Sequence, residues 1–168
     1  VTKTVLLGMN NPQSPDPRHS LYPHPPGCAG HRLWTMLMEA EERAGERKSG
    51  MSGYLNGFER INLLDAIVWD RRLAAARVDS VMDRLDGRRI VMCGATVPKI
   101  VGVHWENWCE WDEAFALRVG FASFEFCVIP HPSGRCREYN DPEMRRAVGD
   151  LLLEEYRRGV PEATTALS

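Results

Sequence analysis

Two loops near opposite ends of the chain contain the side chains best suited to chemistry. The first follows the apolar residues 5–7 and reads Gly-Met-Asn-Asn-Pro over residues 8–12. The second follows residues 126–129 and reads Pro-His-Pro-Ser-Gly-Arg over residues 130–135. Each apolar run is typical of a strand buried on both faces of a parallel sheet, and loops that leave the carboxyl ends of such strands gather at one edge. We therefore expect the amides of the first loop and His131 to converge on one small polar group.

The elements that must position these loops alternate along the chain. Four short apolar stretches are predicted as strands: residues 4–7, 60–64, 90–93 and 125–129. Four stretches with helical periodicity or helix-start signals are predicted as helices: residues 32–43, 71–85, 95–101 and 142 to about 158. Asp141 is the expected N-cap of the last helix, with Pro142 at its first position. Strands separated by helices of this length predict an α/β fold, with a parallel sheet covered by helices on both faces.

Side-chain spacing predicts which faces of these segments are buried. The stripe expected in the first helix is Leu33, Met36, Leu37 and Ala40. The inward set expected in the second helix is Leu73, Ala76, Val78, Val81, Met82 and Leu85. The spacing of Trp105, Trp108 and Trp111 favours one helical face in the core or in a lid, with a base or sugar platform as the alternative. Residues 43–56, with three glycines and mixed charge, are predicted as a mobile loop.

Length and composition indicate one globular domain. The chain has 168 residues, of which 43% are hydrophobic and 26% are charged. We expect a single domain over residues 1–160 and a disordered tail over residues 161–168. No apolar run reaches membrane-spanning length and no signal peptide is visible, so a cytoplasmic protein without membrane contact is expected. Five cysteines without a Cys-x-x-Cys pair predict reduced thiols, and neither a disulfide framework nor a zinc site.

The charge balance limits the kind of nucleic-acid contact that is expected. A net charge of −2 and a pI near 6.2 argue against a broadly basic protein that coats DNA. A local basic stripe can still hold phosphates on an otherwise acidic molecule. Arg135, Arg137, Arg145 and Arg146 supply such a stripe around the second loop, although charge alone equally favours a solvated helix face.

The two loops and the segment between them resemble the uracil-DNA glycosylase superfamily, and most closely its mismatch-specific uracil/thymine branch. Residues 8–12 are similar to the Gly-x-Asn-Pro motif of that branch, with one additional residue. Residues 131–137 read His-Pro-Ser-Gly-Arg-Cys-Arg and resemble the second signature of the superfamily. Between them lie a Pro/His-rich stretch at residues 21–27 and a Gly-His-Arg-Leu-Trp helix start at residues 30–34. The resemblance spans nearly the whole chain and implies a three-layer sandwich around a four-stranded parallel sheet.

The resemblance implies a monofunctional DNA glycosylase that hydrolyses the N-glycosidic bond of uracil or a modified pyrimidine and leaves an abasic site. The family's first loop positions a water molecule with an Asp or Asn side chain. Counting from Gly8 assigns this role to Asn10, and counting back from Pro12 assigns it to Asn11; we prefer Asn10 because the strand end fixes the first residues of the turn. An amide cannot act as a general base, so a slower enzyme than the Asp-containing members is expected. His131 matches the histidine that donates to O2 of the departing base.

The resemblance also implies residues that bind the extruded base. Met9 lies beside the reactive amides, and Tyr22 occupies the place of an aromatic ring that stacks on the base, although a structural tyrosine is equally well supported. Asn62 interrupts an apolar strand, where an unpaired amide is costly. Its adjacent donor and acceptor fit the O4 and N3 edge of uracil.

The remaining implied contacts are to DNA. Ser133 and Gly134 allow the loop backbone to approach phosphates. Arg135 stands where the mismatch branch has an apolar wedge, and Arg137 matches the family's downstream arginine. The expected partner is single- or double-stranded DNA and the expected state is a monomer, associated with the nucleoid if the source is a bacterium or a phage. No metal or other cofactor is expected.

Two functions from other classes stay open. The additional Asn of the first loop is compatible with a nucleic-acid-binding protein that keeps the fold without hydrolysis. A hydrolase of free modified nucleotides is favoured if the basic stripe is too weak to hold duplex DNA.

Overall fold

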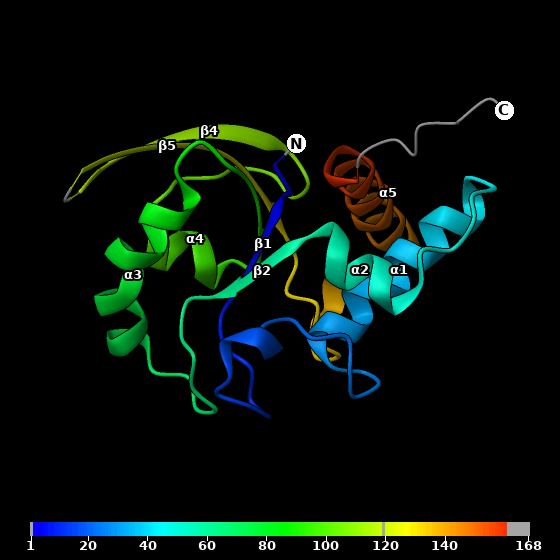
Figure 1. Ribbon diagram of the computed structural model, residues 1–168, viewed down its shortest axis with the longest axis horizontal. Coiled ribbons are helices and arrows are strands. Elements are labelled where there is room, and N and C mark those ends of the chain that lie inside the picture. The colour runs from blue at the N-terminus through cyan, green and yellow to red at the C-terminus, as the bar shows by residue number, and fades with distance from the viewer. Residues whose placement is uncertain (1, 119, 161–168) are drawn as a thin grey trace, which may run out of the picture.

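The computed structural model describes residues 2–118 and 120–160 (Figure 1). Of residues 115–118, 120 and 121 it describes the backbone alone. Within these ranges five strands form one sheet: β1 (Val5–Gly8), β2 (Glu59–Asn62), β3 (Arg89–Cys93), β4 (Trp111–Arg118) and β5 (Gly120–Ile129). The same ranges contain five α-helices: α1 (Ala29–Arg43), α2 (Gly50–Gly57), α3 (Arg71–Leu85), α4 (Thr96–Val101) and α5 (Pro142–Gly159). Two short 3₁₀ helices cover Pro17–His19 and Arg137–Asn140. The tail predicted over residues 161–168 lies outside the described residues.

The sheet has the strand order β2-β1-β3-β5-β4. The four predicted strands are present and pair in parallel, so their carboxyl ends meet at one edge. The prediction of a four-stranded, wholly parallel sheet is wrong in one respect, because β4 adds a fifth strand antiparallel to β5. β4 and β5 are consecutive along the chain and pair antiparallel, and such a pair requires no crossover helix.

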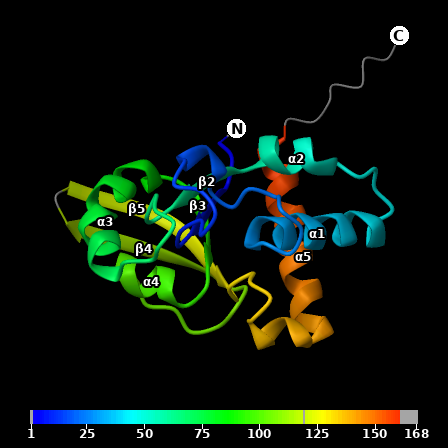
Figure 2. The same ribbon diagram turned by 90° about the horizontal axis from the view of Figure 1, so that it is seen from below.

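Helices cover both faces of the sheet, as predicted, and give three layers (Figure 2). Alternate residues of each strand face opposite layers: Val5 and Leu7 contribute to one core and Leu6 to the other. The core on the side of α3 and α4 includes Ile90 and Met92, while the core on the side of α1, α2 and α5 includes Val91 and Cys93. Because both faces are buried, β1 and residues 90–93 of β3 are apolar, whereas the edge strand β2 (Glu59–Asn62) is mostly polar.

The predicted helices are present, with some differences in their buried faces. Helix α1 buries the expected stripe, and Asp141 caps α5 by accepting a hydrogen bond from the backbone N–H of Glu143 at 2.9 Å. Helix α3 has the predicted bounds, but Leu73 is 54% exposed and Ala76 is also exposed, so both assignments are wrong. Ala74 is buried in their place. Its position aligns with Val78, Val81 and Leu85, which are spaced by three or four residues.

Two segments differ from their predicted conformation. Residues 50–57, taken as part of a mobile loop, form α2. The three tryptophans do not share a helix: Trp105 and Trp108 lie in the connection before β4, with ring centroids 4.4 Å apart, and Trp111 begins β4. The described part of the chain contains no helix that is both long and apolar enough to span a lipid bilayer.

Candidate active site

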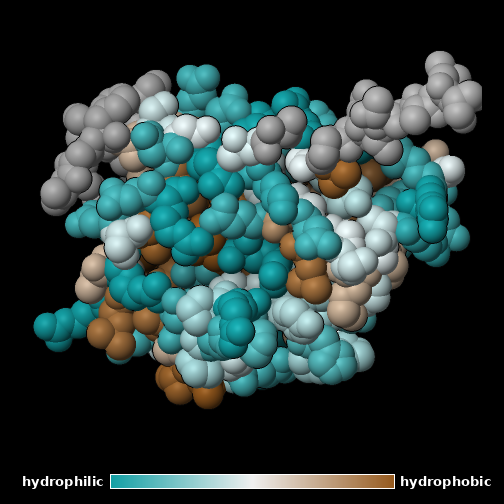
Figure 3. All heavy atoms as spheres, viewed as in Figure 1, coloured by the Kyte–Doolittle hydropathy of each residue, from teal (hydrophilic) through white to brown (hydrophobic). Residues whose placement is uncertain are grey.

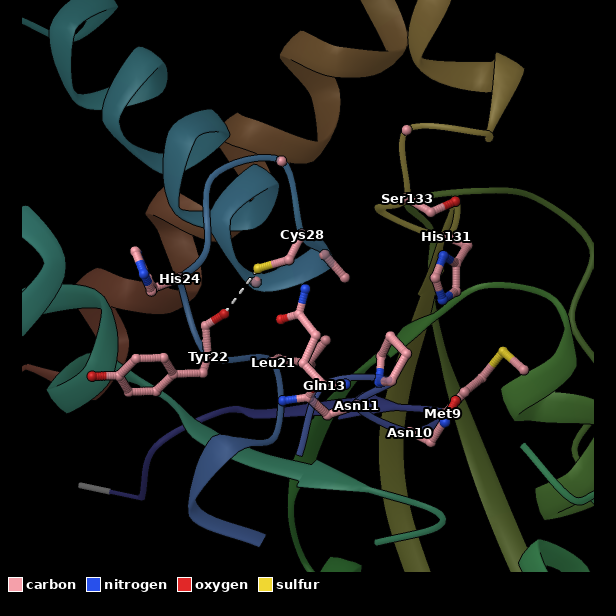
Figure 4. Close-up of a pocket in the computed structure, with 15 residues that line it drawn as sticks. Met9, Asn10, Asn11, Gln13, Leu21, Tyr22, His24, Cys28, His131 and Ser133 are labelled. Carbon is pink, nitrogen blue, oxygen red and sulfur yellow. Dashed lines mark hydrogen bonds between the residues drawn. The ribbon is translucent and has the colours of Figure 1, made fainter. Parts of the chain in front are cut away.

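A cavity of about 430 Å³ opens where the carboxyl ends of β1 and β5 meet the start of α1 (Figure 4). This volume lies in the range of pockets that hold small molecules. Three segments distant in sequence line it: residues 9–13 after β1, residues 21–30 entering α1, and residues 131–134 after β5. The predicted convergence of the two loops therefore occurs in the fold.

The structure brings together most of the predicted site residues. Those that line the cavity are Met9, Asn10, Asn11, Tyr22, His131, Ser133 and Gly134. Three others do not line it: Asn62, Arg135 and Arg137. Both arginines are exposed on the segment beyond Gly134.

Asn10 is held by its amide nitrogen alone. Nδ2 donates hydrogen bonds to the carbonyl oxygens of Ala66 and Ile67, at 3.0 and 2.9 Å, in the connection that follows β2. This anchoring fixes the orientation of the amide and leaves Oδ1 without a hydrogen bond among the described residues. The free oxygen can accept a hydrogen bond from water. A carboxylate at this position would place a second oxygen against the two carbonyl groups, which gives a physical reason for Asn here.

Asn11 uses both ends of its amide within the loop. Its Nδ2 donates to the carbonyl oxygen of His19 at 2.9 Å, and its Oδ1 accepts from the backbone N–H of Gln13 at the same distance. The second contact forms a local turn that begins with an asparagine. Asn11 therefore shapes the first loop, and the structure favours Asn10 as the amide that holds water.

His131 is partly buried at the start of the second loop, and neither ring nitrogen has a hydrogen-bond partner among the described residues. Burial lowers the pKa of the imidazole below its ordinary value of 6.5, so the ring is neutral at pH 7 and offers one donor and one acceptor. The loop is anchored by the hydroxyl of Tyr139, which donates to the carbonyl of Pro130 at 2.6 Å. Gly94, at φ 96°, leaves room for the ring, because a Cβ there would lie 3.0 Å from that of His131.

The wall contributed by residues 21–30 was not predicted in detail. Leu21 adopts a left-handed φ of 46°, and its carbonyl accepts a hydrogen bond from the buried hydroxyl of Tyr54 at 2.9 Å. The thiol of Cys28 donates to the carbonyl of Tyr22 at 3.2 Å. Gly30 is required by close packing, since a Cβ there would lie 2.2 Å from the Leu21 carbonyl oxygen. The Gly-rich helix start at residues 27–30 was the available sequence signal for this wall.

Tyr22 lines the cavity, but its ring has partners elsewhere. The ring lies 5.4 Å from that of His19, between centroids, and the guanidinium carbon of Arg60 lies 5.9 Å from its centroid. In Figure 4 the ring points away from His131 and the first loop. This arrangement favours the structural tyrosine over the stacking platform.

Asn62 lies behind the cavity wall and makes no hydrogen bond through its side chain within the described residues. It is 3% exposed, and its buried Oδ1 would lie 2.6 Å from a Cβ added to Gly8, which also faces Leu21. A buried amide without a partner costs about 1–3 kcal/mol relative to a satisfied one. Such a group at the carboxyl end of β2 is a candidate for contact with a ligand.

The cavity is polar without being ionised. None of the described residues that line it is Asp, Glu, Lys or Arg. Ala29 and Gly30, at the start of the fifteen-residue helix α1, also line it, and the amino end of a helix carries a partial positive charge. The site therefore suits a neutral ligand that gains negative charge during reaction.

An exposed apolar rim borders the first loop. Ile67 is 49% exposed and Val68 is 76% exposed, and the Ile67 carbonyl is one of the two that anchor Asn10. Figure 3 shows hydrophobic side chains protruding at the lower edge of the molecule, the edge at which the parallel strands end. A surface of this kind fits a partner that offers apolar faces.

No protein-family model matches the sequence, and no curated protein matches it. Among the described residues, no group of three or more His, Cys, Asp or Glu side chains is arranged to hold a metal ion. The five cysteines are free thiols. Activity must therefore be inferred from the cavity itself.

Proposed function

We propose that the protein is a monofunctional DNA glycosylase of the uracil-DNA glycosylase type, which hydrolyses the bond between deoxyribose and uracil or a modified pyrimidine. The observation that carries the proposal is the convergence of Asn10 and His131 on one uncharged cavity, each with polar atoms that have no internal partner. The motifs of both loops support it, because they resemble the two signatures of that superfamily in order, the first with one additional residue.

The proposed reaction uses these atoms in distinct roles. Water held by Oδ1 of Asn10 attacks the sugar carbon, the C–N bond breaks, and its electron pair leaves with the base. Negative charge then grows on the base oxygen, where an N–H of neutral His131 donates and the amino end of α1 adds a favourable field. One proton of the attacking water passes to solvent. Because Asn10 orients water without removing a proton, turnover depends on a good leaving base.

Base recognition is proposed for Asn62. Its donor and acceptor match the edge of uracil, and its amide has no partner among the described residues. Asn62 does not line the cavity, so its contact with a base requires side chains of the wall to move aside. Met9 lines the cavity and supplies an apolar face for the base.

The direct test is an abasic-site assay. Oligonucleotides with one deoxyuridine, single-stranded or paired with guanine or adenine, are incubated with the protein and treated with alkali. We expect cleavage at the uracil position after alkali and none before it, with thymine oligonucleotides and the His131→Ala variant as controls. A panel of modified pyrimidines extends the test to other leaving bases.

The assay separates the three functional classes. Tight binding of DNA without abasic sites from any base in the panel would overturn hydrolysis and favour a nucleic-acid-binding protein. Release of free base from nucleoside monophosphates, but not from oligonucleotides, would favour a nucleotide hydrolase. As a DNA glycosylase the protein is proposed to act as a monomer, which size-exclusion chromatography with light scattering tests.

A further inference from the structure

Arg32, near the start of α1, is a partly buried cation without an internal partner. Its side chain makes no hydrogen bond or ion pair with the described residues, and its Nε is buried and unsatisfied. The other partly buried arginines with described side chains all have an acceptor for the guanidinium: Arg60, Arg77, Arg88, Arg89 and Arg145. Arg32 is the exception in the described part of the molecule.

An unpaired guanidinium of this kind calls for an explanation. Removing a charged group from water is unfavourable unless an opposite charge or hydrogen bonds compensate. Folded proteins satisfy most buried polar groups, and exceptions often mark sites where a ligand completes the set. The planar fork of arginine matches the oxygen atoms of phosphate and carboxylate groups.

The position of Arg32 indicates which ligand group it faces. A Cβ added to Gly134 would lie 3.5 Å from Nη1 of Arg32, so the guanidinium is in van der Waals reach of the second loop. Ser133 and Gly134 both line the cavity, as does Gly30 in the same turn of α1. The Ser133 hydroxyl and the Gly134 N–H make no hydrogen bond within the described residues. Arg32 itself does not line the cavity, but its guanidinium lies beside the loop whose Ser133 and Gly134 do.

We propose that Arg32, with the Ser133 hydroxyl and the Gly134 N–H, binds a phosphate group attached to the nucleotide whose base enters the cavity. The proposal rests on the proposed function in one respect, namely that the cavity takes a nucleobase. Phosphate of this kind has two sources, the DNA backbone and a free nucleotide. Arg135 and Arg137 are exposed and lie outside the cavity lining, so their contact with DNA is a separate prediction.

The experiment compares DNA affinity at several NaCl concentrations for the wild type and three variants. Fluorescence anisotropy with a deoxyuridine-containing oligonucleotide serves as readout, so no excision is needed. We expect Arg32→Gln to weaken binding roughly tenfold to hundredfold, the range for loss of a charge-assisted contact. The slope of log affinity against log salt should fall by about 0.9 on duplex DNA or about 0.7 on a single strand, the value of one phosphate.

Two controls isolate the charge from the fold. Arg32→Lys keeps a positive charge without the fork, so it should retain most of the salt slope while losing part of the affinity. Arg47→Gln removes an exposed arginine beyond the opposite end of α1 and should change neither quantity. Arg32→Gln should also melt no lower than the wild type, because it removes an unpaired cation from a partly buried position.

A parallel calorimetric titration distinguishes the two phosphate sources. Deoxyuridine monophosphate and deoxyuridine are compared on the wild type and on Arg32→Gln. A preference for the monophosphate that disappears in the variant, without any change in oligonucleotide binding, assigns the site to a free nucleotide. Loss of oligonucleotide affinity assigns it to the DNA backbone. If neither ligand depends on Arg32, the proposal is overturned.

The outcomes for this site and for the proposed function are separable. An Arg32-dependent salt slope without excision supports the phosphate site and contradicts the glycosylase. Excision of uracil with an unchanged salt slope and unchanged binding in Arg32→Gln supports the glycosylase and contradicts the phosphate site.

Discussion

Polar groups at the two ends of the parallel sheet differ in whether they have hydrogen-bond partners. At the amino end, Glu155 is fully buried and accepts hydrogen bonds from Thr4 at 2.6 Å and from Nε and Nη2 of Arg89 at 3.0 and 2.8 Å. Arg89 also pairs with Glu125 and lies 3.8 Å from the centroid of the Trp111 ring. These contacts raise the pKa of Arg89, chiefly through the hydrogen bonds to Glu155. Charge at this end is paired from several sides.

The carboxyl end has polar groups that lack such partners. Oδ1 of Asn10, the amide of Asn62, both ring nitrogens of His131 and the guanidinium of Arg32 make no hydrogen bond among the described residues. Asn10 and His131 follow the ends of β1 and β5 and line one cavity. Arg32 lies beside Gly134 in the wall of that cavity, and Asn62 ends β2 beside Gly8.

The contrast separates groups that stabilise the fold from groups kept available for a ligand. In a network where every polar group has a partner, a substitution lowers stability, because removal of one member leaves its partners buried and unpaired. Unsatisfied groups carry their cost in the free protein and recover it only when a ligand binds. Substitutions at the two ends should therefore have opposite consequences for stability.

The largest effect is expected at the amino end. Glu155→Ala should lower the free energy of unfolding by about 3–5 kcal/mol, because it strands part of the Arg89 charge in a buried position. Urea denaturation followed by circular dichroism measures the change. Glu154→Ala is the matched control, because that carboxylate is 64% exposed and its ion pair with Arg158 is long, at 3.6 Å. Its loss should change the free energy of unfolding by less than about 0.5 kcal/mol. Equal losses for the two variants would show that the network contributes little.

At the carboxyl end, His131→Ala should lower kcat for excision about 10²–10³-fold, the range for loss of one donor to a developing oxyanion. Binding of DNA and the free energy of unfolding should remain close to wild type, because the ring has no internal hydrogen bonds to lose. Single-turnover kinetics at pH 7, where the lowered pKa leaves the ring neutral, provide the measurement. His104→Ala, at an 88% exposed side chain, is the control. A parallel fall in binding and rate would mean that His131 acts mainly in the ground state.

The two neighbouring asparagines of the first loop show the same contrast. Asn10 has an amide oxygen without a partner among the described residues, whereas Asn11 uses both ends of its amide. Asn10→Ala should slow excision roughly tenfold to hundredfold by misplacing the attacking water. Asn11→Ala should instead lower stability by about 1–2 kcal/mol, through two lost hydrogen bonds, with a smaller loss of rate. Single-turnover rates and thermal melting of both variants test which asparagine acts on the rate and which on stability. The reverse order of rates would assign the water to Asn11.

The four parallel strands were predicted from short apolar runs, because both faces of the sheet are buried. Helices α1 and α3 were predicted from helical periodicity, because one face of each is buried. Helix α2 was not, because Gly50 and Gly53 were taken as loop formers. Gly53 is small for a packing reason instead, since a Cβ there would lie 2.3 Å from that of Ser49, and a Cβ on Gly57 would lie 2.3 Å from the ring of Tyr156. The tryptophan spacing misled in a similar way, because Trp111 belongs to an edge strand whose partner, β5, follows it in sequence.

The site was predictable where motif and strand end coincide, as for Asn10 and His131. The choice between Asn10 and Asn11 depends on the connection after β2, whose carbonyls at Ala66 and Ile67 hold the Asn10 amide. Arg32 gave no signal, because a lack of partners can be seen only once every neighbour is placed. Arg135 is exposed outside the cavity lining, and its contact with DNA stays a prediction.

The effect with the opposite sign is expected at Asn62. Asn62→Leu replaces a 97%-buried amide that has no partner with an apolar side chain of similar size. Because the desolvation cost of the amide disappears, we expect the free energy of unfolding to rise by about 1–3 kcal/mol, as measured by urea denaturation. Asn56→Leu, at an exposed amide on α2, should change it by less than about 0.5 kcal/mol.

Excision by Asn62→Leu should fall at the same time, because the variant cannot read the base edge. A variant that is both more stable and less active would place Asn62 with the groups kept available for a ligand. A destabilised variant would show that the amide is satisfied in the free protein. Asn62 would then belong, like Glu155, to the polar groups that have partners. The two ends of the sheet would differ less in their unpaired polar groups than the geometry indicates.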